Sequence, residues 1–259
     1  MELSIITINF NNKDGLERTI KSVANQTARD FEYIVIDGAS TDDSIDVIKA
    51  NTSIINYWVS EKDTGIYNAM NKGVRASHGT YCLFLNSGDA LLNNRVVERL
   101  LTCDLSADII SGDTQFTTGE RAKAPQHVTM KTFVVGSLNH QSTLIRRSLL
   151  VENPYDERLK IGSDWRFFIQ VLIYKDVSYE RVPVTVSLFD TTGVSNTLSR
   201  QSELRLYEQE LCRDILPLRI EEDYKFAHFI ASWQWRFKRL FNIIRYPYLL
   251  ITYGKKSFD

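Results

Sequence analysis

The N-terminal part of the chain alternates between short apolar runs of strand length and segments whose apolar residues recur at helical spacing. The spacing predicts strands at 3–8, 31–36, 56–60 and 81–85. Helical spacing begins near residues 16 and 45, and a third helix is expected over 65–76. Strands and helices that alternate with short loops predict the α/β class, with a mostly parallel wound sheet and helices on both of its faces.

Polar side chains lie at or just after the ends of the expected strands, namely Thr7, Asn9, Asp37, Asp63 and Asp89. In a wound sheet, ligands bind beyond the carboxyl ends of the strands, so we expect these side chains at one edge. Acids placed together are costly unless a metal ion or a hydrogen-bonding ligand compensates them. A nucleotide fits this pattern, because a carboxylate accepts hydrogen bonds from its base or ribose and a bound cation neutralises its phosphates. Taken alone, the 86–89 segment (NSGD) is typical of an ordinary turn, and the neighbouring acids favour the metal site.

Composition limits the possible partners. The chain has 259 residues and a net charge of −1, enough for one large domain or a domain with a short appendage, and no nucleic-acid partner is expected. Its three cysteines lie far apart without zinc-site spacing, which is typical of reduced thiols in a cytoplasmic protein. The N-terminus lacks signal-peptide features, and no uninterrupted apolar stretch reaches membrane-spanning length. We therefore expect a cytoplasmic protein.

The second half of the chain is less regular. Strands are expected at 109–112, 114–117, 143–145 and 182–189, and helices at 164–174 and 199–216. We expect a main domain over 1–198 and a C-terminal helical segment over 199–259. From residue 226 that segment carries an amphipathic stripe rich in aromatic and basic side chains. Such a helix can lie peripherally on an anionic membrane surface, or it can pack on the main domain or on a second subunit of a homodimer.

A family resemblance rests on segments that agree in order and spacing: 4–12 (SIITINFNN), 35–42 (VIDGASTD), 60–73 (SEKDTGIYNAMNKG) and 79–89 (GTYCLFLNSGD). They resemble the family 2 glycosyltransferases of the GT-A fold, most closely the bacterial branch that builds exopolysaccharide, colanic acid and O-antigen. Shorter matches follow at 139–142, 162–165 and 193–196, so the resemblance covers roughly residues 2–200. It implies a Rossmann-like sheet and an inverting transfer of a sugar from a nucleotide-diphospho-sugar to a saccharide acceptor. A lipid-linked acceptor at the inner face of the membrane is expected.

The resemblance also implies residue roles. Asp164 would be the catalytic base, Asp89 would hold Mg²⁺ or Mn²⁺, and His140 and Gln141 would lie near the sugar or the acceptor. The expected nucleotide-sugar site comprises Thr7, Asn9, Asp37, Asp63, Asn71 and Asn86. The chain departs from the family at Gly38, where a second Asp is frequent, and in the 86–89 segment, where Asp-Ser-Asp-Asp is frequent.

Other interpretations of the same residues stay open. Without the resemblance, the pattern favours Asp164 as the N-cap of a helix starting at Trp165, and a lone His140 is more often a structural hydrogen-bonding group. The alternatives for function are a non-catalytic nucleotide-sugar-binding protein and a related nucleotidyltransferase. A nucleotidyltransferase would need a glycine-rich, basic loop after the first strand, where this chain has Asn-Phe-Asn-Asn at 9–12.

Overall fold

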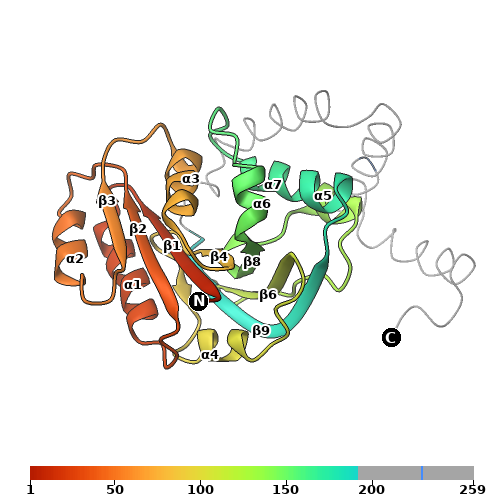
Figure 1. Ribbon diagram of the computed structural model, residues 1–259, viewed down its shortest axis with the longest axis horizontal. Coiled ribbons are helices and arrows are strands. Elements are labelled where there is room, and N and C mark those ends of the chain that lie inside the picture. Colours follow the sequence, from red (N-terminus) through yellow and green to blue (C-terminus); the bar gives the residue numbers. More distant parts are fainter. Residues whose placement is uncertain (192–228, 230–259) are drawn as a thin grey trace, which may run out of the picture.

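The computed structural model describes residues 1–191 and Phe229, and its frame is one sheet of nine strands (Figure 1). The main strand order is β3-β2-β1-β4-β8-β6-β9-β5, and β7 pairs with β6. The first four strands are β1 (Leu3–Asn9), β2 (Phe31–Asp37), β3 (Tyr57–Ser60) and β4 (Tyr81–Phe84). All four run parallel, as the alternation predicts, so their carboxyl ends meet at one edge.

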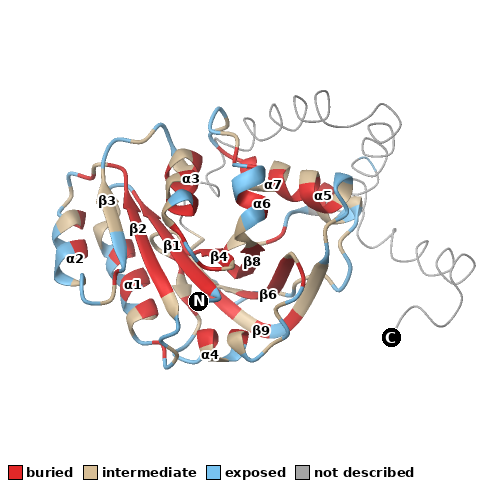
Figure 2. Cartoon of the chain, in the orientation of Figure 1, coloured by how far each residue is buried: buried red, intermediate tan, exposed pale blue. Residues whose placement is uncertain are grey.

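Helices cover both faces of this parallel part: α1 (Lys13–Ala24), α2 (Ser44–Ala50) and α3 (Ile66–Ala76). Successive side chains of a strand point to opposite faces, and β1 shows this directly. Its Leu3 and Ile5 join the core cluster that holds Leu16 of α1, whereas Ile6 and Ile8 join the cluster of α3. Figure 2 shows the buried strands between these layers. The predicted α/β class, with helices on both faces, is confirmed.

The second half extends the sheet with mixed directions. Its strands are β5 (Ala90–Leu91), β6 (Ile109–Phe116), β7 (Arg121–Ala122), β8 (Thr143–Arg146) and β9 (Tyr179–Phe189). Strand β8 is antiparallel to β4 and β6, and β9 is parallel to β6. The helical elements are α4 (Val96–Leu101), α5 (Met130–Val135), η1 (His140–Ser142), α6 (Arg147–Glu152), α7 (Ser163–Phe168) and η2 (Ile169–Tyr174).

Two expectations for this half need correction. The strands expected at 109–112 and 114–117 are one strand, β6, whose register shifts around Asp113. The helix expected from 164 to 174 is α7 followed by the π-helical turn η2. The helices α4, α5 and α6 and the strands β5 and β7 were not predicted, because a six-residue helix has fewer than two turns and a two-residue strand shows no alternation.

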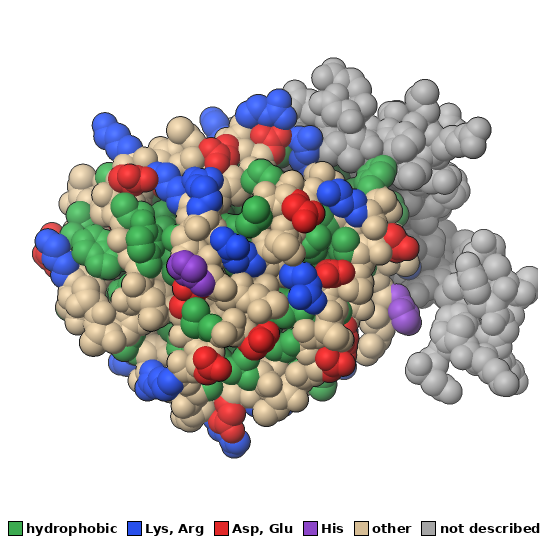
Figure 3. All heavy atoms as spheres, in the orientation of Figure 1, with side chains coloured by type: hydrophobic (Ala, Val, Ile, Leu, Met, Phe, Trp, Pro, Cys, Tyr) green, Lys and Arg blue, Asp and Glu red, His purple; other side chains and the backbone are tan. Residues whose placement is uncertain are grey.

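Several expectations fall outside the described residues: the matching segment 193–196, the helix over 199–216, and the stripe with the domain boundary before it. In the part of the chain that the structure describes, no helix is both long and apolar enough to cross a bilayer. On the molecular face of Figure 3, acidic and basic side chains are interspersed.

Candidate active site

The carboxyl ends of β1, β2 and β3 bring Asn9, Asp37 and Ser60 side by side. Register pairs Asn9 with Asp37 and Asp37 with Ser60. Asp37 Oδ1 accepts from Asn9 Nδ2 (2.8 Å) and Ser40 Oγ (2.6 Å), and Oδ2 accepts from Ser60 Oγ (2.6 Å) and the Ser40 amide (2.9 Å). Burial alone would raise the pKa of Asp37, but these donors outweigh it and hold the pKa below its ordinary value.

Asp37 is therefore already saturated. A carboxylate offers about four lone-pair positions, and all of them have donors here. Its exposed fraction is 0%. The expected direct contact of Asp37 with a base or ribose is not supported by this geometry. Its role in the structure is to lock the ends of three strands together.

Asp63 is a partly accessible carboxylate at this edge. It is half-buried, and its Oδ1 accepts from the Gly65 amide (3.0 Å). A Cβ at position 38 would lie 2.6 Å from Asp63 Oδ2, so the missing side chain of Gly38 leaves the space that this carboxylate fills. Burial raises the pKa of Asp63, and the nearby Asp37 charge adds to the rise. The Asp63 carboxylate thus occupies the space that a side chain at position 38 would fill.

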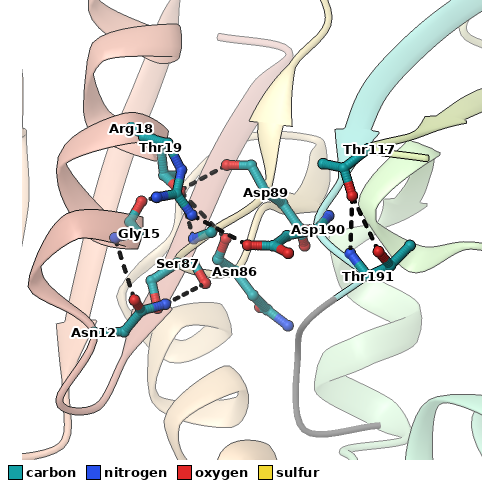
Figure 4. A network of polar contacts seen from close by, with 11 residues as sticks. Asn12, Gly15, Arg18, Thr19, Asn86, Ser87, Asp89, Thr117, Asp190 and Thr191 are labelled. Carbon is teal, nitrogen blue, oxygen red and sulfur yellow. Dashed lines mark hydrogen bonds and ion pairs between the residues drawn. The ribbon is translucent and has the colours of Figure 1, made fainter. Parts of the chain in front are cut away.

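On the other side of β1, the loop after β4 carries Asn86 and Asp89. The loop follows the edge of β1, since the Ser87 amide donates to the Ile8 carbonyl (3.0 Å). Thr19 of α1 secures the loop: its Oγ accepts from the Gly88 amide (3.0 Å) and donates to the Asp89 carbonyl (2.6 Å) (Figure 4). The loop therefore has a fixed position beside the carboxyl ends of β1, β2 and β3.

The Asp89 side chain is buried, with an exposed fraction of 5%. Its Oδ1 accepts from the Asp190 amide (2.9 Å), and Asp190 follows β9 (Figure 4). Burial raises the pKa of Asp89 to about 6, and the negative charge of Asp190 contributes to the rise. Asp190 is itself ion-paired with Arg18 of α1 (3.1 Å).

Asp164 lies in the first turn of α7 and is held by two side chains. Tyr67 of α3 donates to its Oδ1 (2.9 Å), and His140 Nδ1 lies 3.2 Å from its Oδ2. His140 Nε2 in turn lies 3.3 Å from Asn86 Nδ2. The N-cap of α7 is Gly162, so the interpretation of Asp164 as a helix cap is wrong.

The charges in this group support one another. Burial alone would raise the pKa of Asp164, but His140 and Tyr67 hold it below its ordinary value. Burial would lower the pKa of His140, yet Asp164 and then Asp89 raise it. The side chains of Asp164 and His140 each keep 20% of their surface exposed. The base expected from the sequence therefore stays ionised and accessible.

The side chains of three of the expected site residues are buried in the protein. Thr7 is fully buried, and its hydroxyl contacts Tyr33 Oη and the Leu85 carbonyl inside the sheet. The Asn71 amide group bonds the backbone of Tyr155 and the side chain of Glu157. Gln141 is 2% exposed. Thr7 was expected at the site because it lies near a strand end, and Gln141 because it follows His140. The side chains of both are enclosed by the core.

Residues that the sequence did not single out also belong to the site: Ser40, Ser60, Tyr67 and Asp190. A signal existed for two of them, because Ser60 is the last residue of β3 and Asp190 directly follows β9, and the chosen acids also lie at or after strand ends. Tyr67 lies inside the matched 60–73 segment, but helical spacing alone gave it no role. Ser40 acts through a turn whose geometry the sequence does not specify.

The residues around Asp89 could supply part of the coordination shell of a divalent cation, with a bound phosphate ligand supplying the rest. Among the described residues no group of three or more His, Cys, Asp or Glu side chains could form a complete metal site. Mg²⁺ and similar ions commonly use one or two carboxylates and complete their shell with substrate phosphates and water. A buried carboxyl with a raised pKa is short of positive charge, which such an ion would supply.

A wound α/β sheet whose acids gather at the strand ends, with a separate carboxylate beside them, defines an enzyme of the GT-A type. Solved structures share this fold: Staphylococcus aureus TarS 1-349 in complex with UDP-GlcNAc has a TM-score of 0.69 and 16% identity, covering 94% of this chain and 76% of that one. The mannosyltransferase PcManGT from Pyrobaculum calidifontis, in complex with GDP-Man and Mn²⁺, has a TM-score of 0.64 and 15% identity, covering 89% and 73%.

The sequence comparison is more specific. The glycosyl transferase family 2 model matches residues 4–159, and this chain belongs to that family. A PGL/p-HBAD biosynthesis glycosyltransferase of Mycobacterium bovis is 30% identical over 210 residues, which cover 75% of this chain and 79% of the relative. The resemblance seen in the sequence is confirmed, and the chain is an enzyme of the transferase class.

Proposed function

We propose that the protein transfers a sugar from a nucleotide-diphospho-sugar to a saccharide hydroxyl, with inversion, in the synthesis of a bacterial surface polysaccharide or glycolipid. The observation that carries this proposal is the chain of contacts from Asn86 through His140 to Asp164. It sets an ionised, accessible carboxylate beside the loop of the buried acid Asp89. The donor and the acceptor would meet between these two acids.

The donor part rests on the edge formed by β1, β2 and the loop after β4. Asp63 would accept from the ribose or base, Asn9 would lie beside it, and Asp37 would keep the strand ends in place. Strands in a sheet are about 4.8 Å apart, so groups on the two sides of β1 are roughly 10 Å apart, within reach of one nucleoside diphosphate. The TarS complex with UDP-GlcNAc and the PcManGT complex with GDP-Man support a nucleotide sugar as donor.

Mg²⁺ or Mn²⁺ would be held by Asp89, with Asp190 as the neighbouring carboxylate. When bound, the ion would neutralise the charge that develops on the leaving diphosphate. The Mn²⁺ in the PcManGT complex supports a divalent ion here. Because the chain supplies few carboxylates, we expect its metal affinity to depend on the bound nucleotide.

Asp164 would act as the general base. An inverting transfer is a single displacement at the anomeric carbon, and the acceptor hydroxyl must lose its proton as it attacks. The carboxylate needs only to be ionised, accessible and within hydrogen-bond reach of that hydroxyl. The low pKa of Asp164 and its partial exposure satisfy the first two requirements.

A panel of UDP- and GDP-sugars tests the proposal, with nucleotide release measured with Mn²⁺ and with EDTA. We expect metal-dependent turnover of at least one donor, slow with water and faster with a saccharide acceptor, and loss of turnover in Asp164→Asn. Binding of a donor without turnover would favour a non-catalytic binding protein. An Asp164→Asn variant as active as the parent would refute the assignment of the base.

The acceptor and the membrane contact rest on the sequence. The basic aromatic segment from residue 224 onward would bring the enzyme to a lipid-linked acceptor at an anionic surface. Deleting 224–259 should reduce sedimentation with vesicles rich in phosphatidylglycerol and leave donor binding unchanged. Unchanged sedimentation would contradict the membrane contact, and a change in oligomeric state would assign the segment to a subunit interface.

A further inference from the structure

The carboxylate of Asp164 is held at both oxygens by side chains from different parts of the fold. Tyr67 comes from α3 and donates to Oδ1 (2.9 Å), and His140 comes from η1 and lies 3.2 Å from Oδ2. A carboxylate on a free side chain can rotate about its last torsion, whose energy profile is broad. Two donors, one on each oxygen, remove that freedom.

We propose that Tyr67 and His140 are positioning residues for Asp164, and that His140 also ties this carboxylate to the Asn86–Asp89 loop. The inference rests on the proposed function, in which Asp164 is the base. Besides these two side chains, the Trp165 amide also donates to the carboxylate, and together they occupy three of its roughly four acceptor positions. The side chain stays 20% exposed, so the carboxylate can still accept from a substrate hydroxyl. Holding a base within a fraction of an ångström of its productive geometry accounts for large factors in rate.

Tyr67 is itself held rigidly. Its residue is 6% exposed, and its ring packs against Tyr155 with centroids 5.6 Å apart. Tyr155 in turn packs against Phe84 of β4 and Phe167 of α7, at 5.6 and 5.4 Å. This aromatic cluster joins α3, β4 and α7, so the Tyr67 hydroxyl has a fixed place relative to Asp164.

His140 is fixed at its other nitrogen by Asn86. Asn86 Oδ1 is buried and has no hydrogen-bond partner, while its Nδ2 faces His140 Nε2. Rotating the Asn86 amide by half a turn would let Oδ1 accept a hydrogen bond from the Nε2–H of a doubly protonated His140. The charged groups facing His140 are Asp164 on α7 and Asp89 on the loop after β4, and both favour the imidazolium.

The contacts therefore form one path, from the Asn86–Asp89 loop through His140 and Asp164 to Tyr67. The loop holds the acid expected at the diphosphate, and α7 holds the base expected at the acceptor. Their relative position is set by side-chain hydrogen bonds and not by backbone pairing alone. Breaking either contact to Asp164 should misplace the base while the donor edge stays intact.

Kinetics of Tyr67→Phe test this, with Tyr155→Phe as the matched control. Tyr155 lies in the same aromatic cluster, but its hydroxyl is buried without a hydrogen-bond partner. With UDP-GlcNAc and GDP-mannose as donors, kcat of Tyr67→Phe should fall about 10- to 100-fold, the factor expected for a hydrogen bond to a charged group. KM for the donor should not change, and Tyr155→Phe should match the parent in both constants.

The pH profile separates positioning from a general loss of structure. Removing the Tyr67 donor raises the pKa of Asp164, so the acidic limb of kcat/KM should move to higher pH in Tyr67→Phe and in His140→Ala. His140→Asn, whose amide can replace the Nδ1 donor, should recover part of the rate. A Tyr67→Phe variant with the rate and pH profile of the parent would overturn the inference.

The outcome is distinguishable from failure of the proposed function. If Asp164→Asn is inactive and Tyr67→Phe is normal, only the positioning role fails; if Asp164→Asn is fully active, the base itself is refuted. A substrate-free measurement covers the case in which neither donor is turned over. The imidazole of His140, assigned in NMR spectra with His140→Asn, should titrate at lower pH in Asp164→Asn than in the parent, and an equal titration would overturn the contact.

Discussion

Asn9 Nδ2 donates a 2.8 Å hydrogen bond to Asp37 Oδ1 across the last register pair of β1 and β2. With Ser40 and Ser60 it completes a set of donors that leaves Asp37 no free acceptor position. The contact therefore holds the ends of β1 and β2 together. A bound nucleotide would contact other side chains at this edge, such as Asp63.

Asp37→Asn should lower the free energy of unfolding by about 1–3 kcal/mol, because an amide nitrogen would face buried donors that now bond a carboxylate. Urea unfolding of the parent and the variant measures this difference. Asp46→Asn, an exposed position on α2, is the control and should leave the midpoint unchanged. Equal midpoints for all three proteins would contradict the structural role of Asp37.

Gly38→Ala tests whether Asp63 contributes to nucleotide binding. The new Cβ would lie 2.6 Å from Asp63 Oδ2 and 3.1 Å from Phe10 Cδ2, so the carboxylate must turn away and the exposed Phe10 ring must shift slightly, at little cost to the fold because only side chains move. We expect weaker UDP binding with Mn²⁺, measured by calorimetry, with a nearly unchanged melting temperature. Gly136→Ala, where a Cβ meets nothing within 4 Å, is the control. UDP affinity equal to that of the parent would mean that Asp63 does not contact the nucleotide.

The sequence predicted the parts of the site that follow from local periodicity. Parallel strands share one edge, so Asn9 and Asp37 could be placed together from the ends of two apolar runs. The saturation of Asp37 could not be predicted, since it depends on the register that brings Ser60 beside it and on the turn that returns Ser40. Periodicity places residues on a strand or a helix, but it does not say which side chains are enclosed.

Long-range contacts account for the remaining differences. Tyr67 and Asp164 are 97 residues apart, and their hydrogen bond exists only because α3 and α7 pack on the same face. Asp190 reaches Asp89 because β9 pairs with the two-residue strand β5, which has no recognisable sequence pattern. The second half of the chain, where such contacts dominate, was accordingly the less well predicted half.

The buried carboxylate of Glu32 should make the stability of the fold depend on pH in the acidic range. It is 5% exposed and accepts from the His78 and Gly79 amides and from Ser4 Oγ, which joins β1, β2 and the turn before β4. Burial would raise the pKa of Glu32, but these donors hold it below its ordinary value. A lowered folded-state pKa contributes stability above the unfolded pKa of about 4.3, and this contribution is lost as the pH falls through the folded value.

Glu32→Gln should therefore lower the melting temperature at neutral pH, and the difference from the parent should shrink as the pH falls below about 4. Thermal unfolding across this range measures the effect. Glu17→Gln, on the exposed side of α1, should unfold like the parent at every pH. A Glu32→Gln deficit that persists unchanged in acid would show that packing, and not the charge, is responsible.

Asp89 predicts the opposite dependence. Burial raises the pKa of Asp89 to about 6, above the unfolded value of about 3.9. The protonated carboxyl therefore contributes its full stabilisation of the folded state below about pH 3.9, and this contribution is lost as the pH rises through 6. Asp89→Asn should consequently raise the melting temperature of the metal-free protein near pH 7.5, where the parent must bury an ionised carboxylate.

A divalent cation competes with the proton for this carboxylate, so the melting-temperature rise caused by Mn²⁺ with UDP should be smaller at about pH 5 than at about pH 7.5. Asp89→Asn should lose the rise at both pH values, and the exposed control Asp14→Asn should keep it. If Mn²⁺ stabilised Asp89→Asn as strongly as the parent, the cation would bind elsewhere and the buried carboxyl would have no part in holding it.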